Sequence, residues 1–530
     1  MKVLLKGTSL LLLILAGTVM GCKSPENASN FPKRPNILFA IADDQSFPHA
    51  GAYGFAEIKT PAFDKVAKDG VLFNNAFVAA PQCSPSRAAI LTGKNIWQLE
   101  EAGTHASSFP KKLNVFTDML EDAGYQLGYT GKAWGPGNWK IAGWDRNPVG
   151  PAYNEKELTT VPSTGINKRD YFGNFSHFLE KRATGKPFFF WYGGHEPHRV
   201  YEPGSGAKAG KRFKNVQLPG FLPDDSVTRN DVIDYAFEIE YFDAHLLKML
   251  KLLEEKGELA NTVVVVTADN GMPFPYAKAN LQEYGTHVPL AISWPDQIKS
   301  SKKVDDLVSM IDLAPTFLEI AGIKSAPVMT GQSIVPVLFS KGGENTSKRN
   351  YVLTGRERHT HARPDNLGYP ARAIRTKEYL YVKNYKPERW PVGDPVPPND
   401  ENNKRAQTEG FKTLFPGYHD IDGSPSKTFM MKHQHEESVN RLFKNAFEKR
   451  PEAQLFDIQN DPECLYDLSG NTEYSDICAD LRNKLDQELT KQGDPRMFGS
   501  DIFDSYPRYS PMRNFQGFNA RGQYNPAYAD

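Results

Sequence analysis

Two pairs of acidic and polar residues stand where apolar segments of the chain end. Asp43 and Asp44 follow the run that begins at Asn36, and Asp269 with Asn270 follows a valine-rich run. Ligands of open α/β sheets bind beyond the carboxyl ends of the strands, so we expect both pairs at one edge of a sheet. Their oxygen atoms would form a hard metal site that prefers Ca²⁺ or Mg²⁺ to zinc. Taken separately, each pair is also explained by a helix cap or a turn.

A cysteine motif, Cys83-Ser-Pro-Ser-Arg followed by Ala-Ala-Ile-Leu-Thr-Gly, is a third candidate for chemistry. The chain has four cysteines, and Cys22 is a candidate for lipid attachment at the end of an export-like segment. Cys464 and Cys478 are close enough in sequence to close a short loop as a disulfide. Cys83 is then the odd thiol of an oxidising compartment, and it is either buried and inert or has chemistry of its own.

The order Cys-x-Pro-Ser-Arg followed by Leu-Thr-Gly resembles the signature that sulfatases present for conversion of the cysteine to formylglycine. The chain is therefore similar to type I sulfatases of the alkaline-phosphatase superfamily, over most of residues 35–500. The resemblance implies an α/β fold, in which a large mixed, mainly parallel sheet lies between helices and a smaller C-terminal α+β domain follows. It also implies that a formylglycine-generating maturation enzyme acts on Cys83, which would remove the odd thiol.

The same resemblance assigns roles to individual residues. The metal ligands around one Ca²⁺ or Mg²⁺ ion would be Asp43, Asp44, Asp269, Asn270 and the modified Cys83. Arg87 would hold the formylglycine hydrate, and Lys132 and Lys278 would bind the sulfate. His195, the first histidine of His-Glu-Pro-His, would contact an oxygen of the leaving group or of the sulfate.

The chemistry of such a site can be stated in physical terms. An aldehyde hydrate at position 83 would offer two hydroxyls on one carbon, of which one attacks sulfur and the other later expels sulfate. The metal would lower the pKa of the attacking hydroxyl and neutralise sulfate oxygens. Lys132, Lys278 and Arg87 would stabilise the charge that builds on the equatorial oxygens. His195 is a candidate general acid for the departing alkoxide.

One position departs from the family pattern. Many relatives have a histidine two residues after the lysine of the Gly-Lys element, and this chain has Trp134 there. His105 and His198 are the candidates for the missing proton acceptor, and the alternative is slow turnover. Trp134 is itself a candidate for stacking on a sugar face.

Two further features have both a binding and a structural explanation. The segment 356–363 holds three arginines and two histidines. As a binding site, Arg356, Arg358 and His359 would contact carboxylates or further sulfates of an anionic glycan, because arginine forks fit both groups. The alternative is an exposed basic loop paired with nearby acids. His287 is either a substrate contact or a packed core histidine.

Alternating strands and helices have to position these residues. Strands are predicted at 36–43, 126–130, 187–192, 262–267 and 288–294, and helices at 61–68, 115–123, 231–256 and 310–321. This alternation argues for a mainly parallel sheet covered on both faces. Beyond it, strands at 351–354, 371–376, 379–382 and from 455, with a helix at 475–492, predict the smaller α+β unit. Residues 384–450 are typical of a long insertion.

The start of the chain is typical of an exported protein. Residues 1–22 combine a positive start, a short apolar run and the sequence Val19-Met-Gly-Cys, which resembles a bacterial lipobox. We therefore expect a lipid anchor on Cys22 and a place at the bacterial cell envelope, on the outer membrane or facing the periplasm. The alternative is an ordinary secreted protein cleaved nearby. The remaining parts are predicted as a tether (23–34), a catalytic domain (35–345), a C-terminal subdomain (346–500) and an extended tail (501–530).

Composition and motifs together narrow the function. The 63 basic and 63 acidic residues cancel, which gives no electrostatic footprint for nucleic acid. The leading hypothesis is hydrolysis of sulfate esters on a polysaccharide such as ulvan, a carrageenan or a glycosaminoglycan. The stretch from Asp269 to Leu281 resembles the heparan N-sulfoglucosamine sulfohydrolase (sulfamidase) branch, so hydrolysis of N-sulfated glucosamine is the alternative.

Two other hypotheses need different features. A phosphatase or phosphodiesterase of the same superfamily would use a Ser or Thr nucleophile between two metals, whereas the ligands identified here fill one metal site. A non-catalytic glycan-binding lipoprotein is the hypothesis that holds if Cys83 is not modified.

Overall fold

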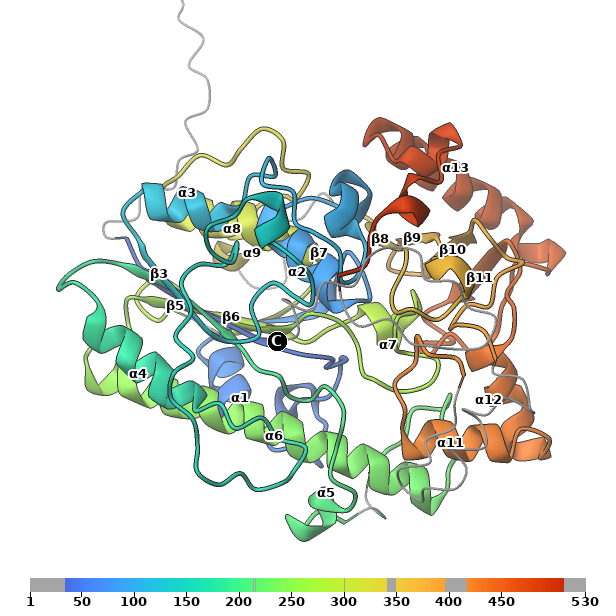
Figure 1. Ribbon diagram of the computed structural model, residues 1–530, viewed down its shortest axis with the longest axis horizontal. Helices are drawn as coiled ribbons and strands as arrows, with labels where there is room; N and C mark the ends of the chain where they lie inside the picture. The colour runs from blue at the N-terminus through green and yellow to red at the C-terminus, as the bar shows by residue number, and fades with distance from the viewer. Residues whose placement is uncertain are drawn as a thin grey trace, which may run out of the picture.

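The computed structural model of the chain describes residues 34–212, 214, 216–299, 301–340, 349–395 and 417–509 (Figure 1). The predicted signal peptide with Cys22, the tether up to residue 33 and the tail from residue 510 lie outside these described residues. Among the helices of the described ranges, none combines the length and the apolar character needed to cross a bilayer.

A seven-stranded sheet forms the centre of the larger part of the molecule, in the order β3-β4-β1-β5-β6-β2-β7. Its strands are β1 (Asn36–Ala42), β2 (Gly70–Phe77), β3 (Gln126–Gly131), β4 (Phe188–Gly193), β5 (Thr262–Ala268), β6 (Leu290–Ser293) and β7 (Lys302–Ser309). Only β6 runs antiparallel to its neighbours. Strands β1, β4 and β5 are buried along their whole length, because they are central and covered on both faces.

Helices cover both faces of this sheet (Figure 1). One face carries α2 (Cys83–Thr92), α3 (Phe116–Asp122), α8 (Leu313–Ile320) and α9 (Val335–Phe339). The other face carries α1 (Pro61–Lys68), α4 (Tyr171–Lys181) and α6 (Ser226–Glu255). The short helices α5 (Ser205–Lys208) and α7 (Glu283–Thr286) lie in the connections. The predicted mixed, mainly parallel sheet between helices is confirmed.

A smaller antiparallel sheet follows, in the order β11-β10-β9-β8. Its strands are β8 (Val352–Arg356), β9 (Ala371–Arg375), β10 (Tyr379–Asn384) and β11 (Ala453–Asp457). Helices α11 (Pro425–Lys432) and α12 (Glu437–Phe447) share an apolar cluster with one face of this sheet, and α13 (Ser475–Lys491) packs with the other face. The apolar residues between α13 and the small sheet belong to the same cluster as the core of the large sheet. The two sheets therefore share one apolar core on this side.

Short 3₁₀ turns complete the described chain. They are η1 (Gly51–Tyr53), η2 (Ile96–Gln98), η3 (Glu100–Gly103), η4 (Lys140–Ala142), η6 (Met310–Asp312), η7 (Pro364–Asn366), η9 (Thr472–Tyr474), η10 (Pro495–Phe498) and η11 (Ile502–Ser505).

Several elements differ from the sequence-based prediction. Helix α6 begins at Ser226 instead of residue 231, because the Asp225 carboxylate accepts hydrogen bonds from two backbone N–H groups of its first turn. Strand β7 was not predicted, since an edge strand that meets water carries charged residues instead of an apolar run. Helices α11 and α12 lie within the segment predicted as an insertion, and α12 buries an apolar stripe there.

The predicted disulfide is wrong, because Cys464 and Cys478 are both free cysteines. Cys464 lies in the cluster that contains α11 and α12, whereas Cys478 lies on α13 and packs against the cluster on the opposite face. The chain passes from one face of the small sheet to the other between them, so closeness in sequence does not bring the two thiols together.

Candidate active site

The two acidic-polar pairs meet at the carboxyl edge of the large sheet. Strands β1 and β5 are parallel neighbours with Ala42 opposite Ala268, so the residues that follow them emerge side by side. The Asp44 backbone N–H donates to Oδ1 of Asp269 at 3.2 Å, and the Asn270 amide donates to Oδ1 of Asp44 at 2.5 Å. All four side chains are buried.

Cys83 begins helix α2 directly against these carboxylates. Its Sγ and one oxygen each of Asp43 and Asp269 all lie within 4.8 Å of one another. Burial raises the pKa of the Cys83 thiol well above its ordinary value, and the nearby Asp43 adds to the rise. Although a helix N-terminus favours a thiolate, burial outweighs it here, so an unmodified Cys83 is a neutral thiol and a poor nucleophile.

The donor set fits a hard divalent cation. Oδ1 of Asp43 and Oδ1 of Asn270 are buried and have no hydrogen-bond partner among the described residues. Burial would raise the pKa of Asp43, but Lys132, His198 and Arg87 hold it well below the ordinary value, so this carboxylate is ionised. Buried anionic and amide oxygens without a partner are the ligands that Ca²⁺ and Mg²⁺ take.

Three buried or partly buried cations surround this group. Lys132 Nζ lies 2.5 Å from Oδ2 of Asp43, and Lys278 Nζ lies 2.5 Å from Oδ2 of Asp44. Arg87 Nε donates to Oδ2 of Asp269 at 2.7 Å, and its Nη1 donates to the Lys132 carbonyl at 2.6 Å. Arg87 therefore links the carboxylate after β5 to the loop after β3.

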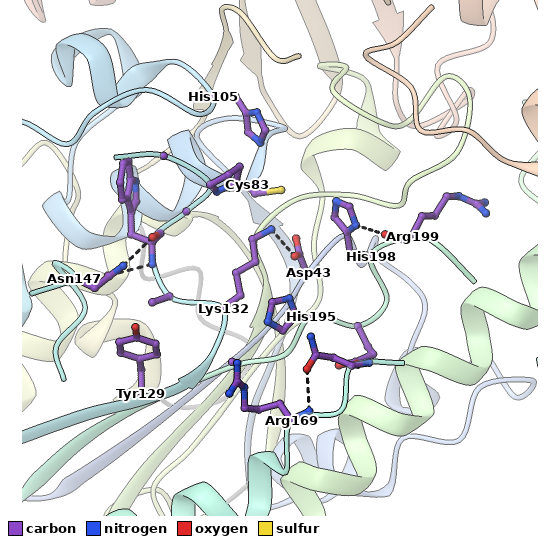
Figure 2. Close-up of a pocket in the computed structure, with 18 of the residues that line it drawn as sticks. Asp43, Cys83, His105, Tyr129, Lys132, Asn147, Arg169, His195, His198 and Arg199 are labelled. Atoms are coloured by element: carbon purple, nitrogen blue, oxygen red, sulfur yellow. Dashed lines mark hydrogen bonds and ion pairs between the residues drawn. The ribbon is translucent and has the colours of Figure 1, made fainter. Parts of the chain in front are cut away.

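A cavity of about 800 Å³ opens in front of Cys83 (Figure 2). Its wall includes the following predicted site residues: Asp43, Cys83, His105, Lys132, Trp134, His195, His198, Lys278 and His359. Figure 2 shows the Lys132 side chain directed at Asp43, with His195 below them and His105 above Cys83 in this view. The structure thus brings most of the predicted catalytic and substrate-binding residues to one cavity.

The histidines of the cavity are held in defined states. Burial lowers the pKa of His195 to about 3, with Lys132 adding to the effect, so its imidazole is neutral. Burial and the neighbouring His359 lower the pKa of His105 well below its ordinary value. The Nδ1 of His105 lies 3.1 Å from the His359 carbonyl and donates to it, which leaves Nε2 as an acceptor. The Nδ1 of His198 donates a hydrogen bond to the Arg199 carbonyl at 2.6 Å.

Trp134 supports the cysteine motif instead of offering a face to solvent. Its indole N–H donates to the Ser84 carbonyl at 3.1 Å, and its ring meets Phe109 edge-on at 5.1 Å. Although it lies at the cavity wall, its side chain is only 3% exposed. The ring therefore fixes the backbone next to Cys83, and too little of its surface is exposed for a sugar to stack on it.

Three candidate substrate contacts, His287, Arg356 and Arg358, do not line the cavity and have structural roles. His287 stacks on Phe47 at 4.1 Å and uses both ring nitrogens, on Glu283 and on the Asn74 carbonyl. It is a packed core histidine, and it does not line the cavity.

Arg356 and Arg358 are also structural, and neither lies in an exposed loop. Arg356 is bound by Asn280, the Pro391 carbonyl and Asp420. Arg358 donates to Oγ of Ser107 at 2.7 Å and to the carbonyls of His105 and Pro507. Of the predicted basic segment, His359 and the adjacent Thr360 line the cavity.

The structure adds cavity residues that sequence reasoning missed. They include Asn154, Arg169 and Asp422. Asp422 lies 3.6 Å from Lys278 and belongs to the segment predicted as an insertion. No motif marks these positions, because each is brought to the cavity by a loop whose path depends on the whole fold.

Comparisons with known proteins agree with this geometry. The family model described as Sulfatase matches residues 35–323, and the model described as N-sulphoglucosamine sulphohydrolase, C-terminal, matches residues 275–414. An ulvan-active sulfatase of Formosa agariphila is 28% identical over 473 residues, which cover 88% of this chain and 82% of that protein. Human N-sulphoglucosamine sulphohydrolase is 27% identical over 522 residues, which cover 90% of this chain and 95% of that protein.

A solved structure shares the fold. It is that of a protein in complex with its substrate D-glucosamine-2-N,6-O-disulfate, and it superposes with a TM-score of 0.60 at 19% identity, covering 87% of this chain and 99% of the other. The Sulfatase model spans more than half of the chain, and the motif cysteine, the carboxylates and the lysines meet in one cavity. The chain therefore belongs to the sulfatase family.

Proposed function

We propose that this sulfatase hydrolyses sulfate esters on a sulfated polysaccharide or its oligosaccharides, after Cys83 has been converted to formylglycine by a maturation enzyme. The observation that carries the proposal is the position of Cys83. It lies in the maturation motif, within 4.8 Å of carboxylate oxygens of Asp43 and Asp269, at the wall of a cavity large enough for a sugar. The names of the relatives, among them an ulvan-active sulfatase, support a polysaccharide substrate.

The residues around the cavity would hold a divalent cation and the sulfate group. Asp43, Asp44, Asp269 and Asn270 would bind the cation, for which we propose Ca²⁺ with Mg²⁺ as the alternative, and it would supply positive charge against the sulfate oxygens. Lys132 and Lys278 would bind the other sulfate oxygens from two sides. Because both ammonium groups are already fixed on Asp43 and Asp44, they need little reorganisation when the substrate arrives.

The nucleophile and proton transfers involve other side chains. A hydrated formylglycine at position 83 would supply the oxygen that attacks sulfur. Arg87 keeps Asp269 and the Lys132 loop in place beside it. His195 is neutral and can donate its N–H to the oxygen of the departing alkoxide, and Nε2 of His105 is the acceptor available for a proton from position 83.

A second candidate function is the hydrolysis of N-sulfated glucosamine. The match of the N-sulphoglucosamine sulphohydrolase C-terminal model to residues 275–414, together with the human relative, favours it. Both reactions use the same sulfate-binding groups, so the sugar and the atom that carries the sulfate would distinguish them.

A two-metal phosphatase is disfavoured by the position of one lysine. Asp44, His198 and Asp422 lie close enough together to hold a second cation. The Lys278 ammonium lies 2.5 Å from Asp44 and 3.6 Å from Asp422, and therefore neutralises this group itself. A lysine in place of a second metal brings one positive charge instead of two, which suits the single negative charge of a sulfate ester.

We also propose that the protein works as a lipoprotein at the bacterial cell envelope. The support is the export-like start and the lipobox-like sequence that ends at Cys22, both outside the described residues. Labelling with a radioactive fatty acid, compared between the natural chain and Cys22→Ala, tests the anchor.

Desulfation of a panel of O-sulfated and N-sulfated oligosaccharides tests the activity. The protein is co-expressed with a formylglycine-generating enzyme, and mass spectrometry of the peptide that contains Cys83 verifies the aldehyde. We expect the matured protein to release sulfate from O-sulfated sugars, and Cys83→Ala to release none. A chelator should abolish the activity, and added Ca²⁺ should restore it. Release from N-sulfated glucosamine alone would support the second candidate. An aldehyde-bearing protein that releases no sulfate from any member, including an aryl sulfate, would contradict both.

A further inference from the structure

Arg169 differs from the other buried or partly buried guanidinium and ammonium groups that line the cavity. Lys132, Lys278 and Arg199 each form an ion pair with a buried aspartate. Arg169 is partly buried and lines the same cavity, yet it forms no ion pair with any carboxylate in the described ranges. Its Nε is buried and has no hydrogen-bond partner among the described residues. A cation kept partly desolvated without a counter-charge is costly unless a ligand supplies the charge.

The surroundings of Arg169 supply further N–H donors. Its Nη1 donates to the carbonyl of Asn154, which is also in the cavity wall. The side-chain oxygen of Asn154 accepts from the Gly131 backbone N–H at 2.8 Å and from Thr130 at 3.2 Å. Because this oxygen is occupied, the Asn154 amide presents its NH₂ group as a donor. Guanidinium and amide donors thus lie together, and Gly131 directly precedes Lys132 of the proposed sulfate site.

Glu196, a carboxyl group in the same cavity wall, is already engaged. Both oxygens of Glu196 accept hydrogen bonds, from the Asn167 backbone N–H and from the Tyr171 hydroxyl, each at 2.9 Å. Burial raises the pKa of Glu196 to about 7, so it carries only part of a negative charge near neutral pH. Glu196 therefore does not neutralise Arg169.

Arg169 is also held firmly by its backbone. Its N–H donates to Oδ1 of Asn167 at 2.9 Å, and it immediately precedes Asp170, which caps α4. Figure 2 shows its side chain at the cavity wall between Tyr129 and His195. The structural arginines Arg356 and Arg358 also have an Nε without a partner, but they differ from Arg169 in three ways. Their Nη groups bind partners on several separate segments, each is 1% exposed, and neither lines the cavity.

We propose that Arg169, together with the Asn154 amide, binds a second anionic group of the substrate beside the sulfate that is removed. The inference rests on the proposed function and names its substrate class: a glycan with two neighbouring negative groups. Guanidinium forks bind carboxylates and sulfates with two parallel hydrogen bonds, so a uronate carboxylate and a second sulfate both have the required chemistry.

Kinetics on matched substrates test this inference. We compare the matured natural protein with Arg169→Ala and Arg169→Lys. The first substrate pair is a sulfated oligosaccharide with a uronate and its carboxyl-reduced form, and the second pair is a disulfated sugar and its monosulfated form. The fifth substrate is 4-nitrophenyl sulfate. The measured quantity is the ratio of kcat/KM between the substrate with a second anion and its partner without one. Lys168→Ala is the control, because it removes an exposed neighbouring charge outside the cavity wall.

We expect Arg169→Ala to lower this ratio about 10- to 100-fold, which is the usual worth of a hydrogen-bonded charge. The ratio for Arg169→Lys should lie between those of the natural protein and Arg169→Ala, because lysine keeps the charge but cannot form two parallel hydrogen bonds. Lys168→Ala should keep the ratio of the natural protein. The uronate pair and the disulfate pair identify which anion is bound. The inference is overturned if the natural protein shows no preference for a second anion, or if Arg169→Ala leaves the ratio unchanged.

The inference and the proposed function fail in different ways. Turnover of 4-nitrophenyl sulfate by the natural protein, without any effect of Arg169 on the ratio, removes the inference and leaves the sulfatase activity standing. An equal loss on all substrates in both Arg169 variants, with lowered melting temperatures, shows a structural role and also overturns it. A matured protein that turns over no substrate contradicts the proposed function and the inference with it.

Discussion

The ammonium of Lys278 lies 2.5 Å from Oδ2 of Asp44, and each side chain is at most 1% exposed. Burial would lower the pKa of Lys278, but Asp44 and Asp422 raise it well above its ordinary value, so the amine is charged. The buried ion pair lies beside Cys83 and the carboxylates, and a sulfate bound there would meet a cation that is already in place.

Replacement of Lys278 by alanine should therefore affect both catalysis and stability. We expect a heavy loss of turnover, and a loss of about 3–5 kcal/mol in the free energy of unfolding, because Asp44 is left buried without its partner. Denaturant unfolding with a chelator, and then with Ca²⁺ or Mg²⁺, measures the second effect. Lys278→Arg is the matched control that keeps the charge. Near-normal turnover in Lys278→Ala would remove this residue from the sulfate site.

Arg358→Ala should act through folding and not through substrate binding. Arg358 joins Ser107 and the His105 carbonyl to the carbonyl of Pro507, so its loss leaves buried acceptors unsatisfied. We expect the free energy of unfolding to fall by about 2–3 kcal/mol, while KM changes little. Lys377→Ala, at an exposed turn, serves as the control. A large rise in KM at unchanged stability would instead restore Arg358 as a substrate contact.

The ion pair between Glu283 and Arg375 should make the free energy of unfolding depend on pH. Burial would raise the pKa of Glu283, but Arg375 and His287 lower it to about 2. Because the folded pKa lies below the unfolded value, its contribution is present above about pH 4.5 and is lost as the pH falls toward 2.

Arg375→Leu tests this dependence. At pH 7 it should cost about 3–5 kcal/mol, since a buried charge loses its partner. The difference from the natural protein should shrink as the pH falls, starting where the unpaired carboxyl group, whose pKa burial raises, takes up a proton and continuing toward pH 2. Unfolding free energies of both proteins between pH 2 and 8 measure it, and a difference that is constant with pH would refute the explanation.

Two histidines compete for the role of proton acceptor. Both use Nδ1 as a donor to a backbone carbonyl, but Nε2 of His198 lies 3.8 Å from Asp44, whereas His105 has no such carboxylate partner in the described chain. We expect His105→Ala to lower kcat about 100-fold or more with little change in KM. His198→Ala is the comparison, and a loss of kcat in it alone would transfer the role to His198.

The amino-acid sequence was sufficient for features that depend on neighbouring residues. Strands β1 and β5 were predictable because a buried parallel strand needs an unbroken apolar run. Helix α1 was predictable because Thr60-Pro61 marks its start. The motif around Cys83 is also contiguous, so the chemistry it indicates can be predicted from the sequence alone. The meeting of Asp43 with Asp269 needed one further rule, that polar residues after parallel strands share an edge.

Partners far apart along the chain were beyond such reasoning. Arg356 and Arg358 formed a basic cluster in sequence, yet their side chains are taken by Asp420 and by the carbonyl of Pro507, which arrive from distant segments. Arg169 carried no motif, and its place in the cavity depends on how the loops before α4 pack against β3. A chain pattern shows which charged groups exist, whereas burial and pairing depend on which segments the folded core brings within hydrogen-bonding distance.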